Sequence, residues 1–123
     1  MPDGDNYNVQ VPGVLGNYGR GIKLLDNVQY SQATANVYTG VWCDCSTMKY
    51  ASVDVEATGL TGTVNIEGTN IDKPVTATTG HALVTAPTGT ALVALTTLPV
   101  RWIRARVSGF TAGSLTAQLH GVA

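Results

Sequence analysis

The chain has 123 residues, a formal net charge of −1 and a charged fraction of only 12%. This length allows one domain with its own core, and the near-neutral charge provides no positive field to attract nucleic acid. No run of about 18 apolar residues is present. The N-terminal stretch MPDGDNYNVQ lacks the basic and apolar regions of a signal peptide, so we expect neither a membrane span nor classical secretion.

Residues 1–35 differ in composition from the rest of the chain. They are rich in Gly, Asn and Asp, and their large apolar side chains follow no sustained period. Because such a segment cannot form a core of its own, we predict an extended N-terminal arm that contacts a neighbour, and removal of residues 1 to about 25 should leave the domain folded. The predicted contact residues are Tyr7, Val9, Val11, Leu15 and Tyr18, with Arg20 adding a charge-assisted hydrogen bond.

Residues 36–123 are dominated by alternation of apolar and polar side chains. This period predicts half-buried strands over residues 49–57 and 63–69, joined as a hairpin by the glycine-bearing stretch 58–62. No segment shows a convincing helical period. Further strands are predicted over residues 74–80, 81–86, 90–99, 100–108 and 114–122, the last two as a second hairpin across 109–113. The sequence therefore predicts an all-β domain, an antiparallel β-sandwich or jelly roll.

Three of the four arginines lie in the stretch LPVRWIRARVSGF, residues 98–110. As a strand, this stretch would direct Ile103, Ala105 and Val107 into the core. Its outer face would then carry Trp102, Arg104 and Arg106.

On that outer face a guanidinium can lie against the indole ring and pair with an acidic residue of another strand, such as Asp54, Glu56 or Glu67. Two interpretations are open: a solvated face with internal ion pairs, and a protein contact face, because Trp and Arg are enriched at interface hot spots. Nucleic-acid binding is the least supported.

The sequence offers little for catalysis or cofactor binding. Cys43 and Cys45 are separated by one residue, which strains a disulfide. Zinc is a minor alternative, because two more ligands would have to come from His81 and His120. We expect thiols in a reducing cytoplasm, no metal and no cofactor. No nucleophile with its base and no carboxylate pair of the catalytic kind stands out, so we expect no enzyme.

The run VWCDCSTMKYASVDVEATGLTGTVNIEGTNID, followed by LPVRWIRARVSGFTAGSLTAQLHGV, resembles small β-sandwich virion proteins of tailed bacteriophages, in particular capsid decoration (cement) proteins. The resemblance covers about residues 41–122. It implies a structural protein made in the host bacterial cytoplasm and carried on the capsid exterior. There it would bind the assembled major capsid protein and stabilise the shell without chemistry of its own.

The low-charge surface also predicts association with a partner or with further copies. A dimer is the preferred unit, and a trimer is possible. The alternative function is a carbohydrate- or receptor-binding module of a tail, fibre or baseplate, because similar hairpins occur in such proteins. The sequence does not separate a capsid location from a tail location.

Overall fold

The computed structural model describes residues 20–86 and 90–123. In chain order the elements are β2 (Arg20–Gln29), the 3-10 turn η2 (Tyr30–Gln32), β3 (Tyr38–Thr39), β4 (Cys43–Asp44), β5 (Tyr50–Thr69), β6 (His81–Ala86), β7 (Ala91–Leu95) and β8 (Trp102–Val122). The strands pair in the antiparallel sense, so the predicted all-β fold is confirmed. Within the described ranges, no helix is long and apolar enough to cross a membrane.

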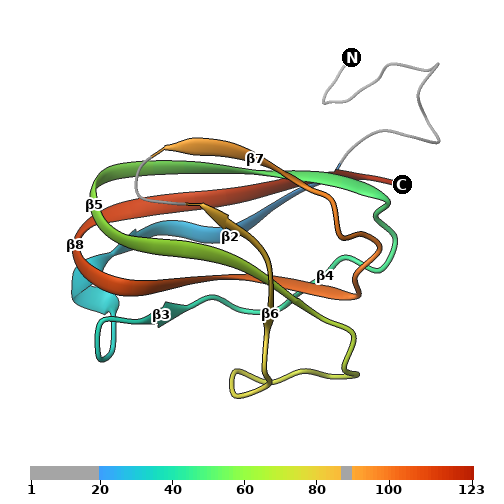
Figure 1. Ribbon diagram of the computed structural model, residues 1–123, viewed down its shortest axis with the longest axis horizontal. Coiled ribbons are helices and arrows are strands. Elements are labelled where there is room, and N and C mark those ends of the chain that lie inside the picture. The colour runs from blue at the N-terminus through green and yellow to red at the C-terminus, as the bar shows by residue number, and fades with distance from the viewer. Residues whose placement is uncertain (1–19, 87–89) are drawn as a thin grey trace, which may run out of the picture.

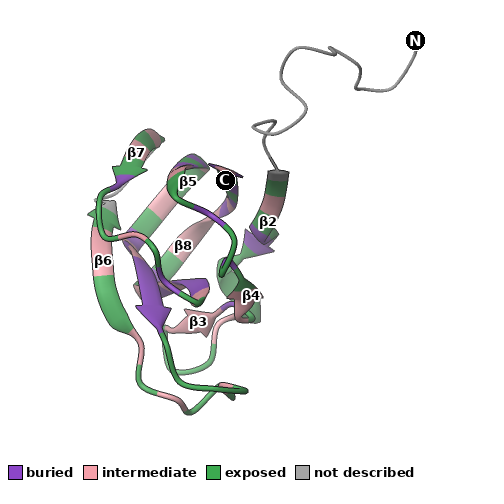
Figure 2. Ribbon diagram, turned by 90° about the vertical axis from the view of Figure 1, so that its right-hand side faces the viewer, coloured by how far each residue is buried: buried purple, intermediate pink, exposed green. Residues whose placement is uncertain are grey.

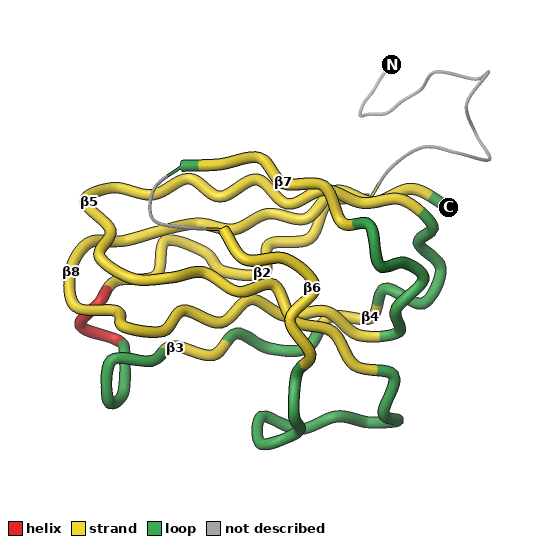
Figure 3. Tube along the Cα trace, viewed as in Figure 1, coloured by secondary structure: helices red, strands yellow, loops and turns green. Residues whose placement is uncertain are grey.

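Two long strands, β5 and β8, form the frame of the molecule (Figure 1). They pair along their lengths, from Tyr50 opposite Val122 to Thr69 opposite Trp102. Both strands bend sharply near their middle, so the sheet folds back on itself, as the trace in Figure 3 shows. The result is a molecule of two layers that share their central strands.

Each layer contains one half of each long strand. The first layer consists of residues 50–58 of β5 and 114–122 of β8, flanked by β7 and by β2. The second layer consists of residues 63–69 of β5 and 102–108 of β8, flanked by β6 and by the short strands β3 and β4. In Figure 2, β7 and β2 lie at the upper part of the molecule and β3 lies at the lower part, while β5 and β8 belong to both layers. This arrangement is the predicted β-sandwich.

The two predicted hairpins, across residues 58–62 and 109–113, are wrong. Residues 50–58 do not pair with residues 63–69, because each of these stretches pairs with β8 in a different layer. The glycine-bearing stretches carry the chain from one layer to the other within a continuous strand. Glycine is common both in bends of this kind and in hairpin turns, so the two look alike in the sequence.

Gly59 and Gly113 allow the two bends to cross closely. Both have positive φ, 60° and 86°, a conformation that other residues rarely adopt. A Cβ atom on Gly113 would overlap the carbonyl group of Gly59. The crossing of β5 and β8 therefore requires glycine at position 113.

The core fills the space between the layers with alternate side chains of the strands. The predicted burial of Ile103, Ala105 and Val107 is confirmed, since all three are 0% exposed. Phe110, in the bend of β8, is 1% exposed. Other fully buried side chains are those of Val53, Val55, Val64, Ile66, Ala117 and Leu119.

The sandwich begins earlier than the predicted boundary after residue 35. Strand β2 pairs with β8 from Arg20 onward, and Leu24, Leu25 and Val28 are buried in the core. Residues 20–35, predicted as part of the arm, thus belong to the sandwich. The register of β2 shifts between Lys23 and Leu25 and again before Val28, and these irregularities remove the alternating pattern that would have indicated a strand.

Candidate partner-binding site

Arg104 is the centre of a buried polar network on the outer side of the second layer. Its Nε donates a hydrogen bond of 2.9 Å to Oε1 of Glu67, its cross-strand neighbour on β5. Its Nη1 and Nη2 donate to the carbonyl oxygens of Thr76 and Thr78 at 2.9 and 3.2 Å. The guanidinium carbon lies 4.2 Å from the ring centroid of Trp42, within cation–π range. Arg104 is therefore fully engaged inside the chain.

The network holds residues 70–80, the loop between β5 and β6, against the outer side of the second layer. Within this loop the N–H of Thr78 donates to the carbonyl oxygen of Val75, and the N–H of Val75 donates to Oγ1 of Thr78, both at 2.9 Å. These bonds close a turn. The strand predicted over residues 74–80 is therefore wrong, because two of its carbonyl oxygens accept hydrogen bonds from Arg104 instead of from a neighbouring strand.

The loop and the segment between β3 and β4 form a groove that we call the tryptophan groove. The indole Nε1 of Trp42 donates to the carbonyl oxygen of Val75 at 3.0 Å, and this bond connects the two walls. Val41 and Val75 are 74% and 64% exposed, so apolar side chains lie open at the groove. The groove has a volume of about 400 Å³ and is lined by Gly40, Val41, Trp42, Lys73, Pro74, Val75, Thr76 and Trp102.

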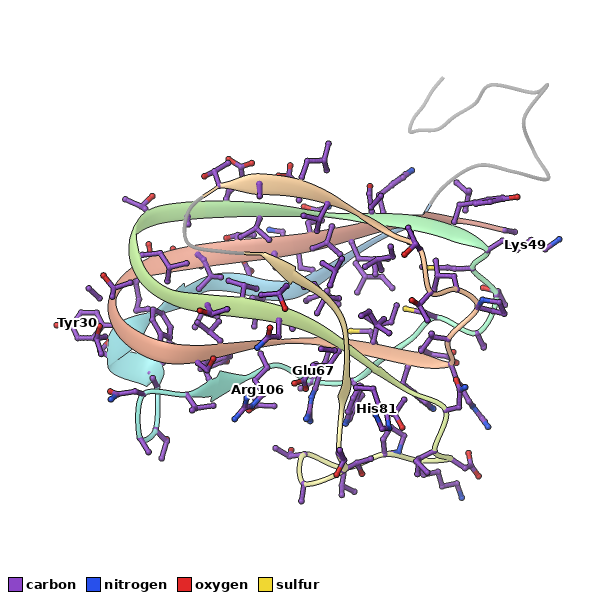
Figure 4. All side chains as sticks on the ribbon, viewed as in Figure 1. Tyr30, Lys49, Glu67, His81 and Arg106 are labelled. Atoms are coloured by element: carbon purple, nitrogen blue, oxygen red, sulfur yellow. The ribbon has the colours of Figure 1, made fainter. Side chains whose placement is uncertain are left out.

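The three strand residues predicted to bind a partner lie on the same side of β8 but differ in exposure. Trp102 is half-buried and lines the tryptophan groove. Its Nε1 is buried and has no hydrogen-bond partner among the described residues. Arg104 is only 5% exposed, because the loop covers it. Arg106 is half-buried, and Figure 4 shows it with Glu67 on the outer side of the second layer. Partner binding by these residues stays a prediction, and Trp102 and Arg106 are the more accessible two.

The other predicted contact residues fall largely outside the described part of the chain. Arg20 is the first residue of β2, opposite Gly121. The charge-assisted contact predicted for Arg20 stays a prediction. Outside the described residues lie Tyr7, Val9, Val11, Leu15 and Tyr18.

The outer face of the first layer is a second candidate surface. Asp54 on β5 lies opposite Leu92 of β7 and Gln118 of β8, and all three side chains are exposed. Glu56 is exposed on the same face, where a hydrogen bond with Asp54 and the repulsion between the two carboxylates raise the pKa of Glu56. His120 is also exposed here. This face is therefore polar, acidic near its centre and open.

The residues considered as metal ligands are not brought together. His81 lies in the second layer opposite Gly68, whereas His120 lies in the first layer opposite Ser52. In residues 20–86 and 90–123, no group of three or more His, Cys, Asp and Glu side chains is placed to hold a metal ion. Cys43 is half-buried and Cys45 is buried.

Trp42 and the loop residues of the groove are not indicated by the sequence patterns. Trp42 and Val75 are 33 positions apart in sequence, and the strand predicted over residues 74–80 gave no indication that Val75 would contact Trp42. The one available signal is the presence of a large aromatic residue in a segment of mostly small and polar residues. Only the folded chain brings this tryptophan to the loop.

These features define the chain as a single β-sandwich built on two bent, paired strands. Its sequence matches no protein-family model and no curated protein. Among solved structures it is similar to the SPBc2 prophage-derived protein YomS, with a TM-score of 0.57 and 8% identity over 96% of this chain and 100% of that one. A structure of the Gx strain of infectious bursal disease virus gives a TM-score of 0.44 and 20% identity, over 86% of this chain and 33% of that chain. At 8% identity the likeness to YomS demonstrates a common fold.

Proposed function

We propose that this chain is a structural virion protein of a tailed bacteriophage, and specifically a capsid decoration protein. It binds the outer surface of the assembled major capsid protein and stabilises the shell without catalysing a reaction. The observation that carries this proposal is the open outer face of the first layer. There, side chains on three adjacent strands are exposed, including those of Leu92, Asp54, Glu56, Gln118 and His120.

The size of this face favours binding to a repetitive surface. Four strands about 4.8 Å apart, of which β7 has 5 residues and β2 has 10, cover roughly 500 Å². A stable protein interface buries about 800 Å² on each partner, so one such face alone would bind weakly. Several linked copies on a capsid lattice bind much more tightly, because each further contact forms within the same assembly.

The chain is therefore proposed to act as a homo-oligomer on the virion exterior, with a dimer as the preferred unit and a trimer as the alternative. The likeness in fold to a prophage-derived protein over its whole length supports a phage context. The low fraction of charged residues supports a surface that is covered in the assembled state.

The test is co-sedimentation of the purified chain with empty shells of the major capsid protein from the phage that encodes it. We expect saturable binding, with a copy number that follows the symmetry of the shell. Glu56→Arg reverses an exposed charge on the first-layer face and should reduce occupancy about tenfold. Absence of binding to shells, with binding to isolated tails, would contradict the capsid assignment.

Lys49→Glu is the matched control for this charge reversal. Lys49 is exposed just before β5, at the end of the molecule away from the bends (Figure 4). Its substitution should leave occupancy unchanged. The two substitutions change the net charge in opposite directions, so equal losses would not follow from net charge. Such losses would show that occupancy does not depend specifically on the first-layer face, which would no longer be the contact surface.

A further inference from the structure

We propose that the tryptophan groove binds residues 3–11 of a second copy of this chain. The inference rests on the proposed homo-oligomer and does not depend on the capsid. A sugar stacked on a tryptophan is the competing occupant, and the test below includes that outcome. The chemistry of the groove favours an extended, acidic and apolar peptide segment.

The groove is preformed by hydrogen bonds of its own chain. Trp42 is joined to Val75 across it, and Arg104 holds the carbonyl oxygens of Thr76 and Thr78 in the wall. A site with fixed walls loses little conformational entropy when it binds a ligand. The exposed side chains of Val41 and Val75 offer apolar area that a bound segment would cover.

The charges around the groove select an acidic partner. Lys73 lines the groove, and Arg106 lies on the same outer side of the second layer. In the described part of the chain, neither residue takes part in an ion pair. A carboxylate placed near either cation would gain a favourable interaction in a partly desolvated site.

Residues 3–11, DGDNYNVQV, have the complementary chemistry in sequence. Two carboxylates, Asp3 and Asp5, come first. They are followed by Tyr7, Val9 and Val11, which alternate with polar residues and would share one side of an extended segment. Such a segment can direct its apolar side chains to the groove while its polar side chains remain in water.

The length and direction of the chain allow this contact between copies. Strand β2 runs from Arg20, opposite Gly121, toward the bends. Arg20 therefore lies at the end of the sandwich away from the bends. Residues 12–19 span up to about 26 Å when extended, which is enough to reach a neighbouring copy that meets this end.

The test uses the full chain in solution without capsid shells, so failure of this proposal is separate from failure of capsid binding. Val75→Asp places a charge in the groove, and Val9→Asp places one in the segment. Each should weaken self-association at least about tenfold in analytical ultracentrifugation. Tyr30→Asp is the matched control, because Tyr30 is 53% exposed in η2, at the end of the molecule where the strands bend (Figure 4), and it should have no effect. Unchanged self-association of Val75→Asp would overturn the proposal.

A mixing experiment shows whether the segment in the groove comes from a second copy or from the chain that carries the groove. The Val75→Asp chain keeps an intact segment, and the Val9→Asp chain keeps an intact groove. Mixed in equal amounts, the two variants should associate with each other more strongly than either associates alone. Absence of association on mixing would overturn the assignment to a second copy.

Peptide binding identifies the occupant directly. A synthetic peptide of residues 1–12 should bind the Val9→Asp chain and change its tryptophan fluorescence, and a peptide with Asp3→Lys and Asp5→Lys should bind at least about tenfold more weakly. The chain carrying both Val9→Asp and Val75→Asp should not respond. A fluorescence response to a panel of oligosaccharides, without one to the peptide, would overturn the proposal in favour of a glycan site.

Discussion

Glu67 and Arg104 lie directly opposite each other on β5 and β8, and the chain buries their ion pair beneath its own loop. The two side chains are 11% and 6% exposed, and their charged atoms are 2.9 Å apart. Removing one partner of such a pair leaves an uncompensated buried charge, which costs far more than the pair itself contributes. Glu67 and Arg104 therefore determine where residues 70–80 can lie.

Replacement of Arg104 should be strongly destabilising. We expect Arg104→Ala to lower the free energy of unfolding by about 3–5 kcal/mol, because Glu67 would remain buried without its partner. Urea denaturation followed by circular dichroism measures this loss. The double variant Arg104→Met with Glu67→Leu should recover much of it, since it leaves no buried charge.

The matched control is Arg101→Ala. Arg101 pairs with Asp72 at 3.1 Å, but these side chains are 47% and 66% exposed. The loss should be below about 1 kcal/mol. If both arginine variants lost the same small amount, the buried network would not be the anchor of the loop.

Gly113→Ala should destabilise the chain by more than about 2 kcal/mol. The new methyl group would overlap the backbone of Gly59, and the alanine would have to keep the positive φ of this position. Gly109→Ala is the control for conformation alone: Gly109 has a φ of 61°, but a Cβ there would have no atom within 4 Å. Its cost should be about 1 kcal/mol. Thermal unfolding of the two variants compares these costs, and equal costs would contradict a close crossing of the bends.

Truncation should separate the start of the sandwich from the residues before it. Deletion of residues 1–19 should leave a cooperative thermal transition and a β-type circular dichroism spectrum. Deletion through Gln29 should abolish folding, because it removes the buried Leu24, Leu25 and Val28, each contributing about 1.5–3 kcal/mol. The prediction that residues up to about 25 are dispensable is corrected accordingly. A folded chain after the longer deletion would show β2 to be unnecessary.

The carboxylate pair on the first-layer face should respond to pH. The pKa of Glu56 is raised by its hydrogen bond with Asp54 and by repulsion. The folded chain therefore binds more protons than the unfolded chain between the ordinary and the raised pKa, so the contribution of this group to stability falls as pH rises through that window.

Asp54→Asn should lower the pKa of Glu56 toward its ordinary value, because it removes the hydrogen bond with the Asp54 carboxyl group and the repulsion between the two carboxylates. An NMR titration of the Glu56 carboxyl carbon measures this change. Asp72→Asn, in the loop over the other layer, should leave the titration of Glu56 as it is. A midpoint that did not move in Asp54→Asn would rule out Asp54 as the cause.

The sequence by itself determined which side chains face the core within each long strand. Alternation is a local property of extended backbone, so the burial of Val53, Val55, Ile103 and Val107 could be predicted without any knowledge of strand pairing. The glycines at residues 58–62 and 109–113 marked the places where the chain changes direction. The all-β class followed from these local signals.

Only the tertiary structure decided what the strands pair with and what covers their outer sides. A glycine-bearing stretch can reverse a strand beside itself or carry it into a second layer, and only the close crossing of Gly59 and Gly113 selects the second. Arg104 faces outward by its position in the strand, yet it is buried, because residues 70–80 fold over it. That burial and the tryptophan groove depend on contacts between segments about 30 residues apart, which no local period in the sequence records.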